Sequence, residues 1–149
     1  MEELDRLAGE LFKTFSRCEY ALKAAGFHNG DGPAEANWTA FAESARAVLD
    51  VPSSKELKTA VAYLLEHAPK KQYVAGGVLI WRDSQPGATS QADLVLQYVR
   101  RVRNNLFHGG KFNGHWLEPE RSEALLRHSL VVLAACLAAS PAVREAYGD

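Results

Sequence analysis

The sequence predicts an all-α protein, an antiparallel helical bundle of five to six helices with one long ordered loop between the third and fourth helices. Apolar residues recur every three or four positions over most of the chain, and helix-capping signals precede several of these stretches. Only the short run VLIW, at residues 78–81, has the character of a strand. Hydrophobic residues make up 47% of the 149 residues, so we expect one globular domain, residues 1–149, with one core.

Apolar stripes predict the first two helices. Between residues 4 and 25 the stripe takes alternate steps of four and three: Leu4, Ala8, Leu11, Phe15, Cys18, Leu22 and Ala25. Gly26 follows, where glycine adopts the left-handed conformation that ends many helices. A second helix is predicted from Pro33 to Leu49, because proline suits a first helical position and because Trp38 and Phe41 begin an apolar face.

The third helix is expected to begin at Ser53, because Ser53 and Glu56 have the spacing of a capping box, and to end before Pro69. The following stretch, residues 70–90, has no helical period. We expect it to be an ordered loop in which VLIW forms either one short strand or an apolar cover over the core. Loops of this length are uncommon in compact domains.

The last helices also carry start and stop signals. The fourth is expected to begin near Ser90, where SQAD again has capping-box-like spacing, with the apolar stripe Val95, Val99, Val102 and Leu106. A fifth begins near Pro119 and runs through ALLRHSLVVLAACLAA, long and apolar enough to be central. Pro141 interrupts it, and a short last helix covers AVREAY.

Composition narrows the class of protein. No apolar run approaches the ~20 residues that span a bilayer, and the acidic start MEELDRLAGELF is unlike a signal peptide. Cys18 and Cys136 lie in apolar helical patterns, which favours buried reduced thiols over a disulfide or a nucleophile. Their spacing gives no zinc motif. We therefore expect a cytoplasmic protein with no membrane partner and no metal or other cofactor.

Charge is distributed unevenly along the chain. The net charge of −1 argues against a broad nucleic-acid-binding surface. Residues 94–117, however, contain no aspartate or glutamate. The cations and histidines of this stretch are Arg100, Arg101, Arg103, His108, Lys111 and His115. This asymmetry suits a small anion-binding site better than a long track along a duplex.

The stretch RVRNNLFHGGKF, residues 101–112, places polar side chains on one face at the end of the fourth helix. At about 100° per residue, this face lies about 200° from the apolar stripe. The residues on it are Gln97, Arg101, Asn104 and His108. Asn104 and His108 are one turn apart, and Arg100 and Arg103 flank them. Two glycines then end the helix and leave space for a ligand next to the backbone, and Lys111 adds a flexible cation.

The run Arg103-Asn104-Asn105-Leu106-Phe107-His108 resembles the R-x(4–6)-H motif of the HEPN superfamily, in the form with a polar residue directly after the arginine. The first-helix stretch FSRCEYALKAAGF is also similar to the first helix of some small bacterial HEPN proteins. HEPN domains are small helical bundles, and many are metal-independent ribonucleases that act as toxins of toxin–antitoxin pairs or in defence systems. The resemblance therefore implies RNA as substrate, a homodimer in which the two motifs face each other, and an antitoxin protein as a partner.

Two features depart from the family pattern. Some HEPN proteins carry a tyrosine shortly after the histidine, where this chain has Phe112. Arg103 and His108 are about 140° apart on an ideal helix. They converge only if the last turn unwinds or if a second chain supplies the partner group.

The residues of the motif suit cleavage of RNA in single-stranded or loop regions. Histidine ordinarily titrates near neutral pH, so His108 can act as the base for the 2′-hydroxyl or the acid for the leaving 5′-oxygen. Arg103 can hold phosphate oxygens in a bidentate contact, and Asn104 can orient the imidazole or donate to a non-bridging oxygen. For binding the flanking phosphates we expect Arg100, Arg101, Asn105 and Lys111. The product expected is a 2′,3′-cyclic phosphate.

Other interpretations remain open from the sequence. A histidine in the last turn of a helix interacts favourably with the helix dipole, and exposed arginines are usually solvated. The chain can equally be a HEPN-like module without catalytic activity that binds RNA or a nucleotide, or that dimerises with a protein partner. A helical protein with a chance match to the motif is a third alternative.

Overall fold

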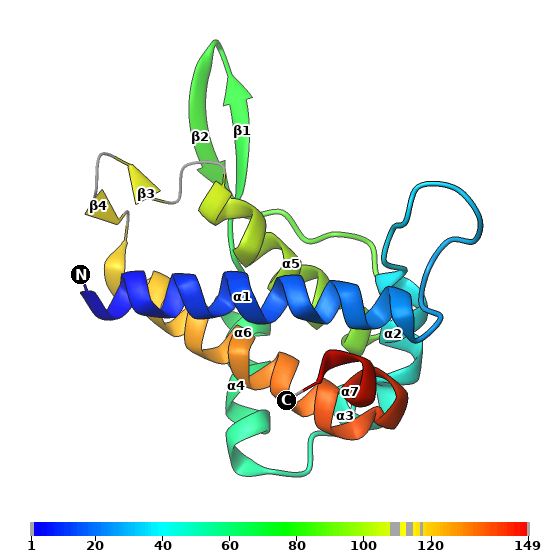
Figure 1. Ribbon diagram of the computed structural model, residues 1–149. Coiled ribbons are helices and arrows are strands. Elements are labelled where there is room, and N and C mark those ends of the chain that lie inside the picture. Colours follow the sequence, from blue (N-terminus) through cyan, green and yellow to red (C-terminus); the bar gives the residue numbers. More distant parts are fainter. Residues whose placement is uncertain (1, 108–110, 113–114, 117, 149) are drawn as a thin grey trace.

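Seven helices and two small antiparallel sheets make up the part of the chain that the structure describes (Figure 1). The structure is a computed structural model that describes residues 2–107, 111–112, 115–116 and 118–148. Of these, the side chains of residues 107, 111–112 and 115–116 are not described. The helical class predicted from the sequence is confirmed.

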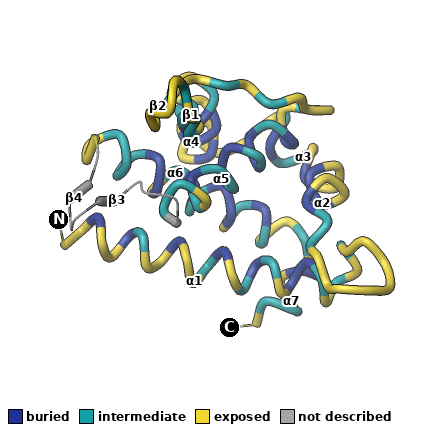
Figure 2. Tube along the Cα trace, turned by 90° about the horizontal axis from the view of Figure 1, so that it is seen from above, coloured by how far each residue is buried: buried dark blue, intermediate teal, exposed yellow. Residues whose placement is uncertain are grey.

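Helix α1 (Glu2–Ala24) ends as the sequence predicts. Gly26 has a positive φ of 99°. The Phe27 N–H donates to the Leu22 carbonyl at 2.8 Å, and the Gly26 N–H donates to the Lys23 carbonyl at 3.2 Å. These two bonds form a Schellman cap. Along α1, buried and exposed positions alternate with the helical period, so one face is turned to the core (Figure 2).

The predicted helix from Pro33 to Leu49 is wrong at its start and in its continuity. Helical structure begins only with α2 (Trp38–Ser44) and is interrupted at Ala45 before α3 (Arg46–Leu49). Ahead of α2 the chain bends at residues 30–33, and Ala36 forms an antiparallel β-bridge with His28. Asn37 then caps α2, because its side-chain oxygen accepts a hydrogen bond from the Ala40 N–H at 3.0 Å.

Helix α4 (Lys55–Glu66) begins one residue later than predicted. Its N-cap is Ser54, whose Oγ accepts a hydrogen bond from the Leu57 N–H at 3.1 Å.

We expect Ser54→Ala to lower the free energy of unfolding by ~1 kcal/mol, because the substitution leaves an N-terminal N–H of α4 without its acceptor. Urea denaturation followed by circular dichroism measures this difference. The neighbouring exposed Ser53 is the matched control, and Ser53→Ala should leave the midpoint unchanged. An equal loss in both variants would contradict the assignment of the cap.

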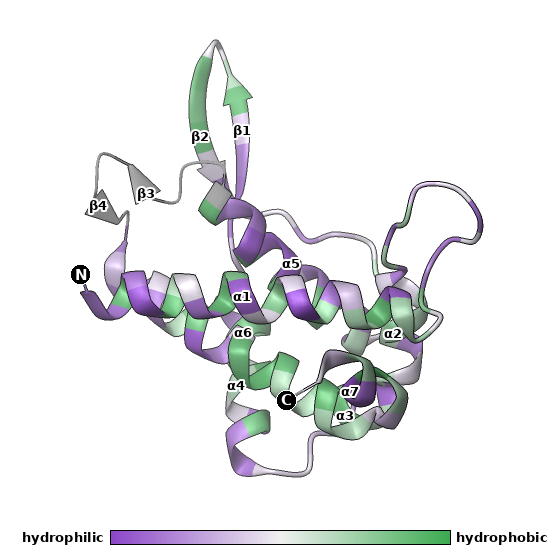
Figure 3. Ribbon diagram, viewed as in Figure 1, coloured by the Kyte–Doolittle hydropathy of each residue, from purple (hydrophilic) through white to green (hydrophobic). Residues whose placement is uncertain are grey.

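The long loop expected at residues 70–90 contains a β-hairpin instead. Strand β1 (Lys71–Ala75) pairs antiparallel with β2 (Val78–Arg82) in the register Lys71↔Arg82 to Ala75↔Val78. Gly76 and Gly77 join them with φ values of 57° and 76°, as a two-residue type I′ turn requires. The hairpin projects away from the helices, and its tip is hydrophobic (Figures 1 and 3).

Helix α5 (Gln91–Phe107) begins as predicted, because Ser90 Oγ accepts a hydrogen bond from the Asp93 N–H at 3.0 Å. Val95, Val99 and Val102 are buried, and Leu106 is partly buried. The predicted apolar stripe is therefore confirmed. Two-residue strands β3 (Lys111–Phe112) and β4 (His115–Trp116) follow, and then α6 (Pro119–Ala139) and α7 (Pro141–Tyr147).

Helix α6 has the central place that its length and composition predict, since it contacts α1, α3, α4, α5 and α7. It is long and apolar enough to cross a membrane by length and composition alone, a property that core helices of soluble proteins share. Leu126, Val132 and Leu133 of α6 are buried in the hydrophobic core. Helix α5 also contacts α2, α3 and strand β1 of the hairpin.

Candidate anion-binding cleft

A cleft of about 610 Å³ lies along the polar side of α5. Trp38 of α2 and Glu19 of α1 contribute to its lining, as do Lys71 and Gln72 of β1. From α5 the described lining residues are Gln97, Arg100, Arg101, Arg103, Asn104 and Asn105. The C-terminal half of α5 is strongly hydrophilic (Figure 3). Every predicted site residue whose side chain the structure describes therefore lines this one cleft.

Aromatic rings of the core support two of the guanidinium groups. The guanidinium carbon of Arg103 lies 4.7 Å from the centroid of the Phe15 ring, and that of Arg100 lies 5.6 Å from the Trp38 ring. The two rings stack on each other at 5.1 Å with an interplanar angle of 25°. Cations over aromatic faces gain electrostatic stabilisation from the ring quadrupole. The stack fixes both guanidinium groups at the boundary between core and cleft.

The guanidinium group of Arg100 is partly buried and therefore poorly hydrated. Desolvation lowers the pKa of Arg100 from its ordinary value, and the negative charges of Asp93 and Glu19 partly oppose this effect. Glu19 is the carboxylate among the described lining residues, and its Oε2 accepts a hydrogen bond from Trp38 Nε1 at 2.9 Å. Arginine keeps its charge in proteins, so a poorly hydrated guanidinium is available to an anion at a reduced desolvation cost.

Arg101 and Asn105, which the sequence predicts as substrate contacts, hold the hairpin against α5. Arg101 Nη1 donates to the Ser84 carbonyl at 2.6 Å and to the Pro69 carbonyl at 3.2 Å, so it joins the segments at both ends of the hairpin. Asn105 Nδ2 donates to the Lys70 carbonyl at 2.8 Å. Both residues thus build the wall of the cleft. This role was not predicted, because a loop was expected where the hairpin lies.

We expect Arg101→Met to loosen the hairpin and to lower the free energy of unfolding by about 1–3 kcal/mol, since two backbone carbonyls lose a charged donor. Limited trypsin digestion should then cut faster after Lys71 and Arg82. Arg127→Met, which removes an exposed guanidinium paired with Glu3 on the surface, is the control. Equal digestion of the two variants would contradict the anchoring role of Arg101.

The other predicted site residues are less completely placed. Asn104 is exposed and lines the cleft. His108 lies outside the described residues, and Lys111 lies in β3 with its side chain outside them. Glu19, Lys71 and Gln72 were not predicted from the sequence, because only the tertiary structure brings α1 and the hairpin to α5. The cations of α5 that line the cleft were predicted because residues 94–117 contain no acidic residue.

The two cysteines do not contribute a nucleophile to this cleft. Both are buried and free of disulfides, as predicted. Burial raises the pKa of the Cys18 thiol to about 12 and that of the Cys136 thiol to about 12. Both thiols are therefore protonated at neutral pH. Among the described residues, no group of three or more histidine, cysteine, aspartate or glutamate side chains is placed to hold a metal ion.

No protein-family model, no curated protein and no solved structure matches this chain.

Proposed function

We propose that this chain is a HEPN-like, metal-independent endoribonuclease that acts as a homodimer, and that it serves as a toxin or a component of a defence system. The observation that supports RNA binding most directly is the cleft. It collects Arg100, Arg101, Arg103 and Lys71, and Glu19 is the opposing carboxylate among its described lining residues. A concave surface with an excess of cations attracts phosphodiesters and strengthens their binding.

The geometry supports distinct roles for the cleft residues. Arg103, fixed over Phe15, would grip the scissile phosphate through its planar fork of donors and stabilise the charge of the phosphorane. Asn104, which is exposed and precedes His108 by four residues in the sequence, would donate to a non-bridging oxygen or orient the imidazole. His108 would transfer the proton of the 2′-hydroxyl or of the leaving 5′-oxygen. Lys71 and Arg100 would bind the neighbouring phosphates.

A homodimer would supply the second histidine that this cleavage reaction needs. RNA cleavage through the 2′-oxygen needs both a base and an acid, and one chain has one His108. Two motifs that face each other across a two-fold axis would supply both. An antitoxin would then inhibit by covering the cleft.

A non-catalytic RNA- or nucleotide-binding module is the second candidate. The described cations of the cleft are arginines and a lysine, which bind phosphate through charge and hydrogen bonds. These side chains alone would give binding without cleavage. The two candidates therefore differ only in what His108 does.

One experiment separates them. Purified protein, with its oligomeric state measured by light scattering, is incubated with 5′-labelled RNA in EDTA, and the product ends are analysed. Fragments with 2′,3′-cyclic phosphate termini support the nuclease. Bound but intact RNA with dimeric protein supports the binding module. Failure to bind RNA at low salt contradicts both.

A further inference from the structure

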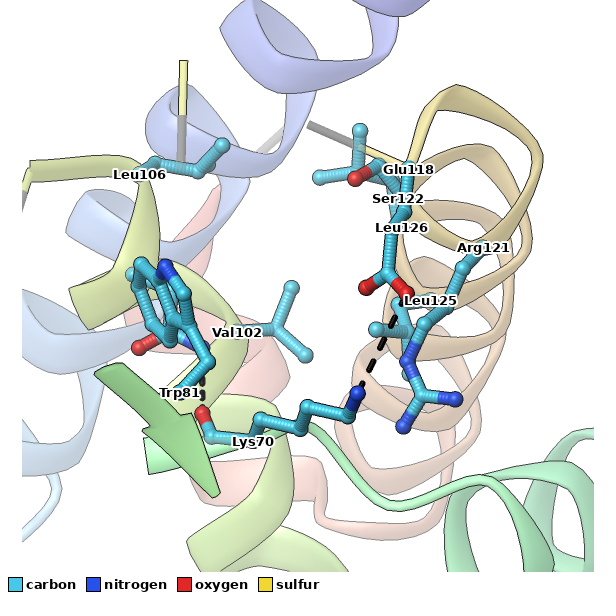
Figure 4. Close-up of a pocket in the computed structure, with 10 residues that line it drawn as sticks. Lys70, Trp81, Val102, Leu106, Glu118, Arg121, Ser122, Leu125 and Leu126 are labelled. Carbon is cyan, nitrogen blue, oxygen red and sulfur yellow. Dashed lines mark hydrogen bonds and ion pairs between the residues drawn. The ribbon is translucent and has the colours of Figure 1, made fainter. Parts of the chain in front are cut away.

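A second hollow, with a volume of about 90 Å³, opens between the hairpin, α5 and α6 (Figure 4). Trp81 of β2 and Val102 of α5 lie on one side of it, and Leu125 and Leu126 of α6 lie on the other. We call this hollow the Trp81 pocket. The apolar part of its lining is an indole ring and four branched aliphatic side chains, those of Val102, Leu106, Leu125 and Leu126, and such groups suit a flat apolar ring.

Charged groups stand at the mouth of the Trp81 pocket. Lys70 reaches toward Glu118, with 3.9 Å between Nζ and Oε1 (Figure 4). Arg121 lies beside them and donates to the carbonyls of His67 and Ala68. Glu118 has a φ of 49°, a left-handed conformation that is uncommon outside glycine and that often marks functional sites. An apolar interior with polar groups at its rim suits a ring that carries hydrogen-bonding groups along its edge.

The Trp81 pocket and the cleft share one boundary. Asn105 lines both of them. Gln72, which lines the cleft, is the cross-strand partner of Trp81. Lys70 lines the pocket, and the next residue, Lys71, lines the cleft. In a nucleotide a single ribose separates the phosphate from the base, so a cationic cleft beside an aromatic pocket matches the two ends of one nucleotide.

We propose that the Trp81 pocket binds the base of a nucleotide whose phosphate lies in the cleft, and that it prefers a pyrimidine. This inference rests on the proposed binding of RNA. Trp81 stacks on the base, as aromatic side chains do in proteins that bind single strands. A cavity of about 150 Å³ encloses a whole benzene ring. A pocket of about 90 Å³ can therefore enclose part of one six-membered ring. The fused rings of a purine extend further beyond its walls.

Binding of three 2′-O-methyl hexanucleotides tests the proposal, since a methylated 2′-oxygen cannot attack the phosphate. The probes are a uridine hexamer, an adenosine hexamer and a hexamer of abasic residues, with fluorescence anisotropy as the readout. We expect the uridine probe to bind about tenfold more tightly than the abasic probe, as base stacking provides, and more tightly than the adenosine probe.

Two variants test whether the Trp81 pocket causes the preference for the uridine probe. Trp81→Ala removes the stacking surface, and Leu106→Phe fills the pocket while keeping an apolar residue in the helix. Both should reduce uridine binding to the level of the abasic probe. Leu79→Ala is the matched control, because Leu79 lies two residues away on the same strand and is 65% exposed. It should retain the preference.

The possible outcomes distinguish a failure of the base-pocket proposal from a failure of the proposed RNA binding. Equal binding of the uridine and abasic probes by the wild type would overturn the base pocket and leave phosphate binding in the cleft intact. Tightest binding of adenosine would overturn the pyrimidine preference. A preference that survives both Trp81→Ala and Leu106→Phe would place base recognition elsewhere. Failure of all three probes to bind would overturn the proposed function itself, and the base pocket with it.

Discussion

With His108 replaced by alanine, the protein is expected to bind RNA as tightly as the wild type and to cleave it about 10²–10⁴ times more slowly. The substitution removes the group that transfers a proton near neutral pH, whereas the cations of the cleft remain. Single-turnover cleavage in EDTA gives the rate, and anisotropy with an uncleavable RNA gives the affinity. Undiminished cleavage by this variant would contradict a catalytic role for His108.

The same assay distinguishes the role of Arg103 from that of His108. Arg103→Ala should lower the cleavage rate by about 10²–10³, as the loss of one donor to a developing oxyanion does, and should also weaken binding. Arg103→Lys should recover binding more than rate, because lysine keeps the charge but lacks the planar fork of donors. Arg127→Ala, on the surface of α6, removes the same charge away from the cleft. An equal effect of Arg127→Ala would indicate that overall charge matters, not the cleft.

Local signals predicted the helices well. The Schellman cap at Gly26 and the serine cap at Ser90 form where the sequence places them, because a cap depends on residues within one turn. Helix α2 starts later than Pro33, because the chain bends at residues 30–33 and Ala36 pairs with His28 in a β-bridge. Residues 28 and 36 come together only when the loop between them closes. The local sequence of residues 33–37 therefore gives no indication of this contact.

The hairpin was missed although its turn was visible in the sequence. Gly76-Gly77 between two apolar stretches is a type I′ signal, but the strands lack a regular alternation of polar and apolar residues. Val74, Val78 and Leu79 are 69%, 61% and 65% exposed, so burial does not impose the usual period of two.

Part of the candidate site was predictable for a different reason. A run of cations on one helix without neighbouring acids concentrates positive charge whatever the fold, so Arg100 and Arg103 were predicted from the sequence. Asn104 was predicted because it follows Arg103 in the motif and shares a helix face with residue 108. The anchoring role of Arg101 depends on a hairpin that was not predicted from the sequence. The rings beneath Arg100 and Arg103 come from α1 and α2, which are distant in sequence from α5.

Phe15→Ala is expected to lower the free energy of unfolding by about 3–5 kcal/mol, the largest stability effect that we predict. Phe15 is 2% exposed, lies in the hydrophobic core and stacks on Trp38. Removing the ring leaves a cavity and also removes the surface under Arg103. Urea denaturation measures the stability loss. A loss below ~1 kcal/mol would contradict the central place of this ring in the core.

Phe15→Leu separates packing from support of Arg103. Leucine keeps most of the buried volume, so the stability loss should stay below about 1.5 kcal/mol. The cation–π contact is lost, and RNA cleavage should fall by about threefold to thirtyfold. Leu64→Val, in α4, is a control of similar stability cost, because it removes one buried methylene that does not line the cleft. Leu64→Val should cleave RNA at the wild-type rate.

A double-mutant cycle then tests whether Phe15 acts through Arg103. If the ring matters because it fixes the guanidinium, Phe15→Leu should have no further effect on cleavage once Arg103 is alanine. If instead the two losses multiply, Phe15 influences the cleft by another route, such as the position of Trp38 under Arg100. The cycle therefore decides whether the aromatic stack at the edge of the core is part of the phosphate-binding site or only of the fold.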